Sequence, residues 1–179
     1  PDAASVASFE ASMDLAAIGK HYDRRYAESL GLPEKGLRMD FRRSDSLWLR
    51  PWGQVEEGRI EEDALRGRAS GSDPVLIGPP YLGFEARRYK KVVFTLSATA
   101  GKHGQVFWQR EEDTDWVGER GVDFELNADG RPHEYTVYLS GNPLWEGRIK
   151  TLRFDPMDAP GEFALYQFET VSVAEEGPE

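Results

Sequence analysis

Residues 122–139 read VDFELNADGRPHEYTVYL, and this stretch decides the fold class. Apolar residues alternate with polar ones on both sides of a turn: Val122, Phe124 and Leu126 before it, and Tyr135, Val137 and Leu139 after it. A period of two is typical of β-strands with one buried face. Gly130 in the turn supplies a left-handed backbone conformation. The stretch therefore predicts a β-hairpin with a loop of about five or six residues.

The same texture continues on both sides of this stretch. Short runs rich in Val, Leu, Phe, Tyr and Thr are separated by turn residues and predict strands near 37–42, 47–50, 64–69, 75–77, 91–98, 104–109, 122–126, 133–139, 150–155 and 162–173. No helical pattern lies between these runs, so each sheet must cover its apolar face with a second sheet. The chain is therefore predicted to be all-β, a jelly-roll antiparallel β-sandwich with a short N-terminal helical segment.

The first part of the chain has a different pattern. Apolar residues between Ser5 and Leu32 recur every three to five positions, which predicts a helix within Asp14–Ser29 that ends near Gly31. We expect residues 1–35 to be a helical appendage or linker, residues 36–175 the sandwich, and residues 176–179 a disordered tail.

Composition excludes several classes of function. The 179 residues carry a net charge of −10, which opposes attraction to nucleic acid or to an anionic bilayer. No apolar run approaches the roughly 18 residues of a membrane span, so no membrane insertion is expected. The chain has no cysteine, and its three histidines are isolated, so neither a disulfide nor a zinc site is predicted.

An ordered series of motifs marks the region from Leu37 to Val173. The series runs DPVLIGPP, YKKVVFTLSAT, GQVFWQ, GVDFEL, HEYTVYL, WEGRIKTLRFDP and GEFALYQFETVSV. It resembles the galactose-binding-like, carbohydrate-binding-module-like β-sandwich domains of bacterial carbohydrate-active and cell-surface proteins. The helical segment before the sandwich is a departure from this pattern.

The resemblance implies a non-catalytic accessory module outside the cytoplasm, whether extracellular, cell-surface or periplasmic. Its partners would be a glycan or polysaccharide and the domains of a parent enzyme. The resemblance also implies a structural Ca²⁺ ion, for which Asp155–Asp158, Glu111–Asp113 and Asp40 offer oxygen ligands.

Sugar recognition needs a flat apolar surface for the C–H face of a pyranose ring and planar polar groups for its hydroxyls. Trp116 lies in a polar loop, and Trp108 shares a strand face with Val106, while the other face, with Gln105, Phe107 and Gln109, is of mixed polarity. We predict that these two residues and Tyr81 stack on the ligand. Gln109, Arg110 and Glu119 are predicted to provide hydrogen bonds. Trp48 and its neighbours Leu47 and Leu49 are predicted to be core residues.

The stretch NPLWEGRIKTLRFDP, Asn142–Pro156, adds further candidates. Trp145 and Glu146 lie in its loop part, where Trp145 either contacts a ligand or closes the end of the sandwich. In its strand part, Leu152 and Phe154 point to the core. Arg153 and Asp155 point the other way. These two residues either brace the sheet as an ion pair, which we favour because unpaired burial is costly, or present a fork to sugar hydroxyls.

Two other functions remain as alternatives to glycan binding. A structural or docking domain would contact protein partners and have no glycan ligand. A stand-alone glycoside-active enzyme would need two positioned carboxylates, and no catalytic motif such as G-x-S-x-G or a P-loop occurs in the chain. We therefore expect no intrinsic catalysis.

Overall fold

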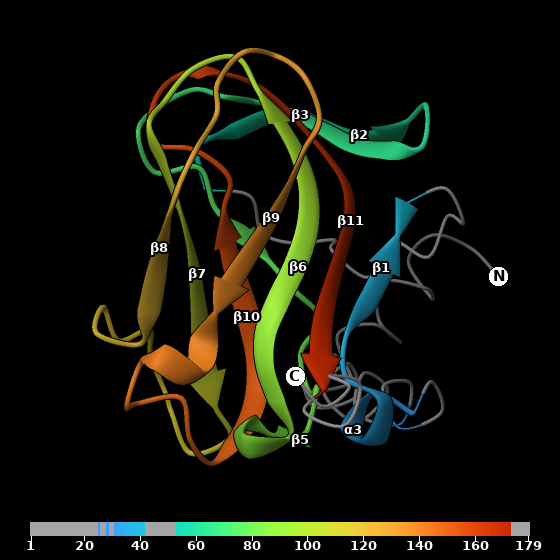
Figure 1. Ribbon diagram of the computed structural model, residues 1–179, viewed down its shortest axis with the longest axis vertical. Helices are drawn as coiled ribbons and strands as arrows, with labels where there is room; N and C mark the ends of the chain where they lie inside the picture. Colours follow the sequence, from blue (N-terminus) through green and yellow to red (C-terminus); the bar gives the residue numbers. More distant parts are fainter. Residues whose placement is uncertain (1–24, 26–27, 29–30, 42–52, 173–179) are drawn as a thin grey trace, which may run out of the picture.

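Two antiparallel sheets pack face to face in the computed structural model, which describes residues 25, 28, 31–41 and 53–172 (Figure 1). The predicted all-β sandwich is confirmed. The predicted helix in Asp14–Ser29, the strand at 47–50 and the core residue Trp48 lie outside the described residues, apart from residues 25 and 28 of the predicted helix. None of the described helices has the length and the apolar character needed to cross a bilayer.

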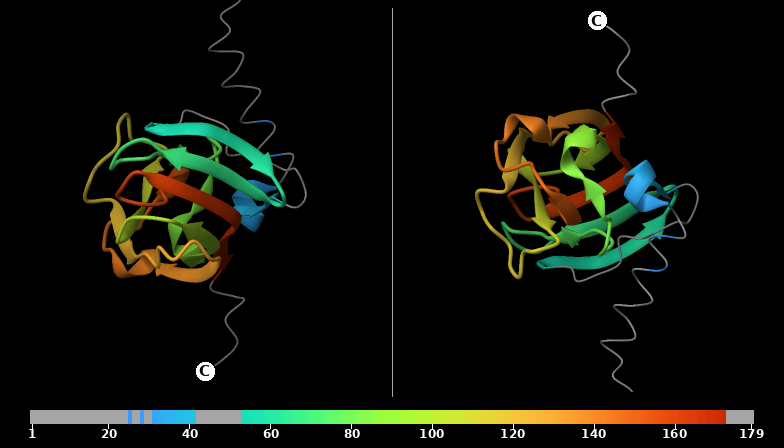
Figure 2. Two further views of the ribbon diagram at one scale, coloured as in Figure 1. Left: turned by 90° about the horizontal axis from the view of Figure 1, so that it is seen from above. Right: turned by 90° about the horizontal axis from the view of Figure 1, so that it is seen from below.

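The large sheet has six strands. Its order is β2 (Val55–Glu61), β3 (Ala64–Ala69), β11 (Gly161–Ser172), β6 (Tyr89–Ala98) and β9 (His133–Tyr138), and β1 (Arg38–Asp40) also pairs with β11. Figure 2 shows β2, β3 and β11 following one another along one side of the molecule. The long strand β11 is central because it pairs with three other strands.

The small sheet has five strands. Its order is β4 (Leu76–Ile77), β10 (Arg148–Asp155), β7 (His103–Arg110) and β8 (Gly121–Glu125), and β5 (Phe84–Glu85) also pairs with β10. Three short helical turns complete the described elements: α3 (Leu32–Lys35), η2 (Ala86–Arg88) and η3 (Leu139–Gly141).

Aromatic rings from both sheets build the core. Phe94 of β6 and Phe154 of β10 are fully buried and meet edge to face, with 5.0 Å between ring centroids. Phe168 of β11 stacks on Phe94 at 5.7 Å. Leu152 is also fully buried. The prediction that Leu152 and Phe154 face the core is therefore confirmed, and the neighbouring positions of β10 must face outward.

The predicted hairpin at 122–139 is wrong. β8 pairs with β7 in the small sheet, whereas β9 pairs with β6 in the large sheet, so the connection between them crosses from one sheet to the other. Phe124 and Tyr135 face each other across the core, with ring centroids 5.4 Å apart. Gly130 has the predicted left-handed backbone, with φ of 78°. Alternation places one face of each strand in the core but does not say whether two strands share a sheet.

The remaining predicted strands in the described part of the chain are present. β2 and β5 were not predicted. β2 lacks an apolar face, since all but the first of its seven residues are exposed. β5 has only two residues. Neither strand has an alternation of apolar and polar residues long enough to be recognised in the sequence.

Candidate functional site

The outward side of the small sheet carries an ordered set of mostly polar side chains, which we call the small-sheet face. Three come from β7, three from β10 and two from β8: Gln105, Phe107 and Gln109; Asp155, Arg153 and Thr151; Asp123 and Gly121. The strand register places Phe107 directly between Arg153 and Gly121. An aromatic ring therefore lies in the middle of a polar surface.

Phe107 is partly exposed, and its neighbours fix its position. A Cβ atom on Gly121 would collide with Cε1 of Phe107, so the ring occupies space that only a glycine leaves open. On the other side, the guanidinium carbon of Arg153 lies 5.1 Å from the ring centroid. The ring is thus held in place by its two cross-strand neighbours.

Gln109 is buried without a polar partner. Only 8% of this residue is exposed, and its side chain makes no hydrogen bond to any residue that the structure describes. Thr151, opposite Gln109 on β10, donates its hydroxyl hydrogen to the carbonyl of Gly78 at 3.2 Å. The amide atoms of Gln109 are not fully enclosed, so they can exchange hydrogen bonds with water for hydrogen bonds with a ligand.

Arg153 and Asp155 form the ion pair that the sequence favoured. Arg153 donates from Nε to Oδ1 of Asp155 at 2.8 Å and from Nη2 to Oδ2 at 2.6 Å. The same Nη2 donates to Oδ1 of Asp73 at 2.6 Å. Burial raises the pKa of Asp155 to about 6, although the Arg153 guanidinium opposes that shift. Arg153 therefore links the strand to the Asp73 loop.

A cleft of about 240 Å³ opens at one end of the small-sheet face. Gln105 and Asp123 lie side by side in it, with Nε2 of Gln105 donating to Oδ1 of Asp123 at 2.7 Å. Asp158 also lines it and accepts a hydrogen bond from the backbone N–H of Lys102 at 2.7 Å. The cleft thus offers mainly hydrogen-bond acceptors to a ligand.

An arginine cluster stands at the opposite end of β7. Arg110 pairs with Glu112 at 2.9 Å, Glu146 at 3.3 Å and Asp113 at 3.5 Å, and Arg120 also pairs with Asp113. Burial alone would raise the pKa of Asp113, but the backbone N–H of Arg110 and the Arg120 guanidinium lower it below the usual value. Arg110 therefore braces the loop after β7.

Two candidate tryptophans are buried, and the prediction that Trp108 stacks on a ligand is wrong. Trp108 has no exposed surface, and Trp145 is 7% exposed. Their rings meet edge to face at 5.0 Å. Each indole N–H donates to a backbone carbonyl, that of Leu144 for Trp108 and that of Tyr89 for Trp145. Trp145 closes the end of the sandwich, which is the other role considered from its sequence.

The other candidates occupy three places. Gln109 and Arg153 belong to the small-sheet face, and Arg110 and Glu146 to the arginine cluster. Trp116, partly exposed, and Glu119, exposed, lie in the loop between β7 and β8.

Tyr81 lies apart from the small-sheet face. It has a left-handed φ of 64° and lines a separate cleft with Glu111 and Arg148.

Four residues of the site were not predicted from the sequence: Phe107, Gln105, Asp123 and Asp73. The signal for the first two was present, because Gln105, Phe107 and Gln109 alternate along one strand face. Trp108, the larger neighbouring ring, was predicted to bind the ligand instead, although it lies on the buried face of β7. Asp73 joins the site through its ion pair with Arg153, 80 residues along the chain, and Asp123 joins it through the pairing of β7 with β8. A single sequence does not reveal either pairing.

Metal ligands do not converge in the described part of the chain. No group of three His, Asp or Glu side chains there is arranged to hold an ion. Asp155 faces Arg153, and Asp158 faces Lys102. The expected Ca²⁺ ion stays a prediction.

No protein-family model and no curated protein sequence matches the chain, but solved structures do. An unliganded module, BiXyn10A CBM1, has a TM-score of 0.50 at 12% identity, covering 77% of this chain and 99% of its own. A mutant of a family 29 carbohydrate-binding module has a TM-score of 0.50 at 6% identity, covering 74% and 87%. The chain has the β-sandwich fold of carbohydrate-binding modules.

One further match is a low-affinity xylan-binding module, CBM86, from the gut symbiont Roseburia intestinalis. Its TM-score is 0.49 at 15% identity, covering 70% of this chain and 89% of that module. At such identities the carbohydrate-binding-module likeness concerns the fold, so the ligand must be inferred from the site itself.

Proposed function

We propose that this chain is a non-catalytic module that binds a neutral glycan on the small-sheet face. The observation that carries the proposal is the combination of Phe107 and Gln109, two residues apart on β7. Phe107 offers a partly exposed ring, and Gln109, a mostly buried residue, offers an amide that makes no hydrogen bond to a described residue. A sugar has both an apolar C–H face and hydroxyl groups, so one sugar ring satisfies both requirements.

Each residue then has a role in binding. Phe107 stacks on the C–H face of a sugar ring, and the Gln109 amide accepts and donates hydrogen bonds to its hydroxyls. Gln105 and Asp123 contact the next sugar along the cleft. Arg153 does not bind the ligand in this proposal. Its guanidinium lies over the Phe107 ring and forms hydrogen bonds with Asp73 and Asp155.

Residues on the surrounding loops extend this surface in the proposal. Trp116 and Glu119 lie on the loop that begins at the Gln109 end of β7, and Glu146 lies on the loop that Arg110 holds beside it. Tyr81 would serve only a ligand long enough to reach its separate cleft. These assignments rest on position and residue type.

The fold of carbohydrate-binding modules supports an accessory role in a larger bacterial carbohydrate-active or cell-surface protein, outside the cytoplasm. The competing function is a docking domain that contacts a protein partner without a glycan. The two proposals differ in whether the isolated chain binds a polysaccharide.

Affinity electrophoresis against a panel of soluble neutral polysaccharides tests the proposal. The wild-type chain should be retarded by at least one of them, and Phe107→Ala and Gln109→Ala should migrate as in a gel without glycan. Thr136→Ala, exposed on the large sheet, is the matched control and should behave as wild type. Equal melting temperatures for all four proteins would show that folding is intact.

Two outcomes would contradict the proposal. Absence of retardation by every glycan would favour the docking function. Retardation that survives both substitutions would place the glycan elsewhere on the molecule.

A further inference from the structure

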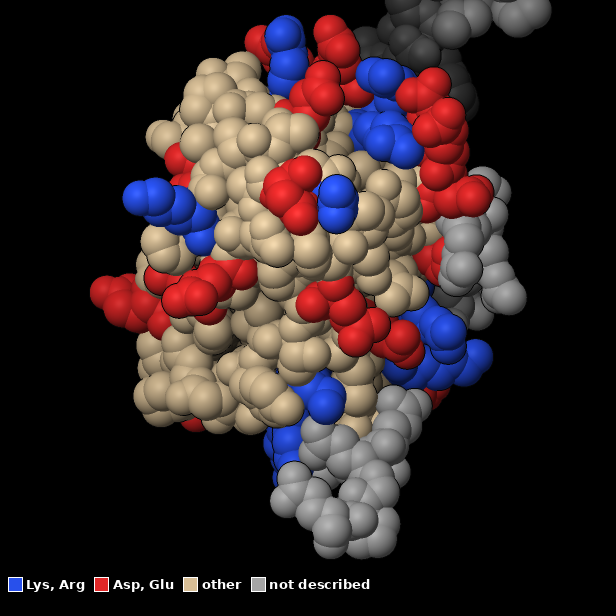
Figure 3. Space-filling model, turned by 45° about the horizontal axis from the view of Figure 1, so that its top comes forward, with Lys and Arg blue, Asp and Glu red and all other residues tan. Residues whose placement is uncertain are grey.

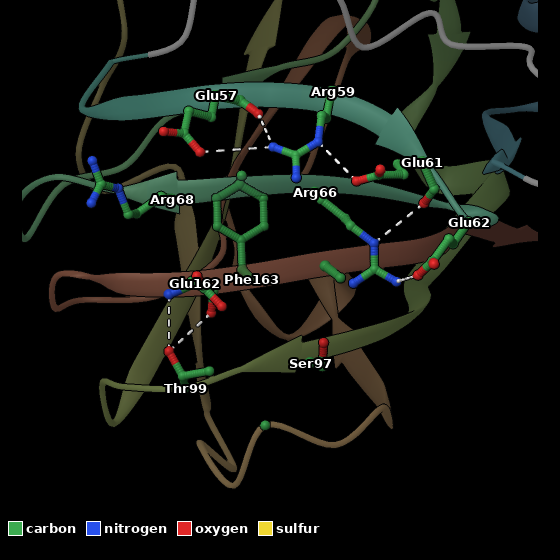
Figure 4. A pocket seen from close by; sticks show the side chains of 13 residues that line it. Glu57, Arg59, Glu61, Glu62, Arg66, Arg68, Ser97, Thr99, Glu162 and Phe163 are labelled. Carbon is green, nitrogen blue, oxygen red and sulfur yellow. Dashed lines mark hydrogen bonds and ion pairs between the residues drawn. The ribbon is translucent and has the colours of Figure 1, made fainter.

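The outward side of the large sheet carries a cavity of its own, of about 340 Å³ (Figure 4). It lies on the other side of the sandwich from Phe107 and shares no residue with the small-sheet face. Its volume is at the lower end of the range for small-molecule sites. We call it the large-sheet cavity.

The strand register explains why the sheet is hollow here. Arg59 of β2, Arg66 of β3, Ala164 of β11 and Ser97 of β6 stand directly opposite one another across four strands. The first two side chains are long and the last two are short. The arginines therefore form a wall over a floor of small residues.

Ser97 on this floor is a mostly buried residue whose hydroxyl has no partner in the described ranges. It is 8% exposed, and its hydroxyl makes no hydrogen bond to any residue in the described ranges. In Figure 4 this hydroxyl points into the cavity, on the side where Arg66 lies. The hydroxyl oxygen is not fully enclosed, so a ligand in the cavity can replace the water that it contacts.

Donors and acceptors alternate around the wall. Arg59 donates from Nε to Oε2 of Glu61 at 2.8 Å, and Arg66 donates from Nη2 to Oε2 of Glu62 at 3.1 Å. Each of these arginines keeps at least one terminal nitrogen without a described acceptor. The pairs hold the guanidinium planes in place, and their remaining N–H groups can donate to a ligand.

Charge in the cavity is almost balanced. The lining includes three arginines (Arg59, Arg66, Arg68) and four glutamates (Glu57, Glu61, Glu62, Glu162), which gives a formal charge of −1. Figure 3 shows acidic and basic side chains interspersed at the end of the molecule where β2 and β3 lie. An anion would gain no net attraction here, whereas a neutral polyol can use both donors and acceptors.

We propose that the large-sheet cavity is a second binding site, specific for a neutral saccharide. Phe163, the aromatic residue in the lining, is 3% exposed and offers no stacking surface. This site therefore binds through hydrogen bonds alone and is weaker than the Phe107 site. It shares the ligand class of the proposed function but none of its residues, so either proposal can fail without the other.

Titration of the ¹⁵N-labelled chain with cellobiose, xylobiose and glucuronate, followed by NMR, tests the second site. A neutral disaccharide should shift the amides of Ser97, Thr99 and Glu162 in a saturable way, and should do so equally in Phe107→Ala. Ala164→Leu, which fills the floor, should weaken this binding by about tenfold or more. Arg66→Met, which removes the guanidinium and keeps an apolar stem, should do the same if the filled variant is unstable.

Thr136→Leu is the control, because Thr136 is exposed on β9 of the same sheet and does not line the cavity. Three results would overturn the inference. No saturable shift at the three amides would exclude a saccharide site here. Shifts with glucuronate alone would identify an anion site. Loss of the shifts in Phe107→Ala would mean that one site produces both signals. If the three amides shift while no amide of the small-sheet face does, only the proposed function is overturned.

Discussion

Trp108 and Trp145 have indole rings in the core and indole N–H groups that donate to backbone carbonyls. Truncating Trp108 to alanine would leave a cavity between the sheets and an unpaired carbonyl at Leu144. We expect Trp108→Ala to lower the free energy of unfolding by about 3–5 kcal/mol, measured by urea denaturation. Trp116→Ala, in the partly exposed loop, should change it by less than about 1 kcal/mol. Similar losses in both variants would contradict these placements.

The carboxyl group of Asp155 has the largest expected effect of pH. Its pKa is about 6 in the folded protein and 3.8 in the reference state, so between these values the folded chain holds a proton that the unfolded chain has lost. The free energy of unfolding contributed by this group therefore falls as pH rises from about 4 to 6 and stays constant above that. The folded protein is less stable with Asp155 ionised than with Asp155 protonated, because the charged carboxylate is buried.

Comparison of the wild type with Asp155→Asn isolates this effect. The difference in their free energies of unfolding should move in favour of the variant by up to about 3 kcal/mol between acidic and neutral pH. Denaturation in urea at several pH values measures it. Asp113, Asp129 and Asp158, whose pKa values are lowered, titrate in both proteins and cancel. A difference that is independent of pH would show that the ion pair with Arg153 fully offsets the effect of burial on the pKa, and a difference that moves in favour of the wild type as pH rises would show that the ion pair outweighs burial.

Between elements, Asn142 joins two loops at one end of the sandwich. Its Nδ2 donates to the carbonyls of Glu119 and Gly121 at 2.9 and 3.0 Å, and its Oδ1 accepts from the N–H of Leu144 at 2.9 Å. Asn142→Asp keeps the acceptor but sets a carboxylate against two carbonyl oxygens.

We expect Asn142→Asp to lower the free energy of unfolding by about 2 kcal/mol in urea denaturation. Asn127→Asp introduces the same charge at an exposed position and is the control. If both variants lose the same stability, the added charge rather than the lost donors is responsible.

The elements also show what a single sequence can and cannot specify. Alternation identified β6, β7, β10 and β11 because each buries one face, and turn residues marked their ends. It misassigned the pairing of β8 and β9, because facing strands across a core and neighbouring strands in a sheet need the same alternation. It missed β2, whose exposed residues carry no pattern.

The candidate site was predictable to a similar degree. Gln109 and Arg153 were identified from residue type and strand face, and the pairing of Arg153 with Asp155 followed from their spacing. Phe107 was missed because Trp108, the larger ring, was weighed as the stacking residue. Which face of β7 is buried depends on the strands that cover it, and those lie far away in the sequence.

For the molecule as a whole, the net charge of −10 bears on the class of polysaccharide. Long-range repulsion opposes a polyanion, while stacking and hydrogen bonds to a neutral glycan are not screened by salt. Binding of a neutral polysaccharide should therefore be the same at low and high ionic strength, and polygalacturonate should not bind at low salt. Calorimetric titration measures both. A steep fall in affinity for the neutral glycan with added salt would show that charged contacts dominate.

The crossing of the chain between β8 and β9 also has a consequence for folding speed. Since β8 and β9 follow each other in sequence but pair in different sheets, and β11 pairs with β1, β3 and β6, most native pairings join distant parts of the chain, and the ends of long loops must meet before either sheet is complete. Chains with such topology fold in roughly milliseconds to seconds. The refolding time measured by stopped flow is expected to fall in that range. Until the connection between the two sheets forms, their apolar faces stay exposed and can associate with other unfolded chains.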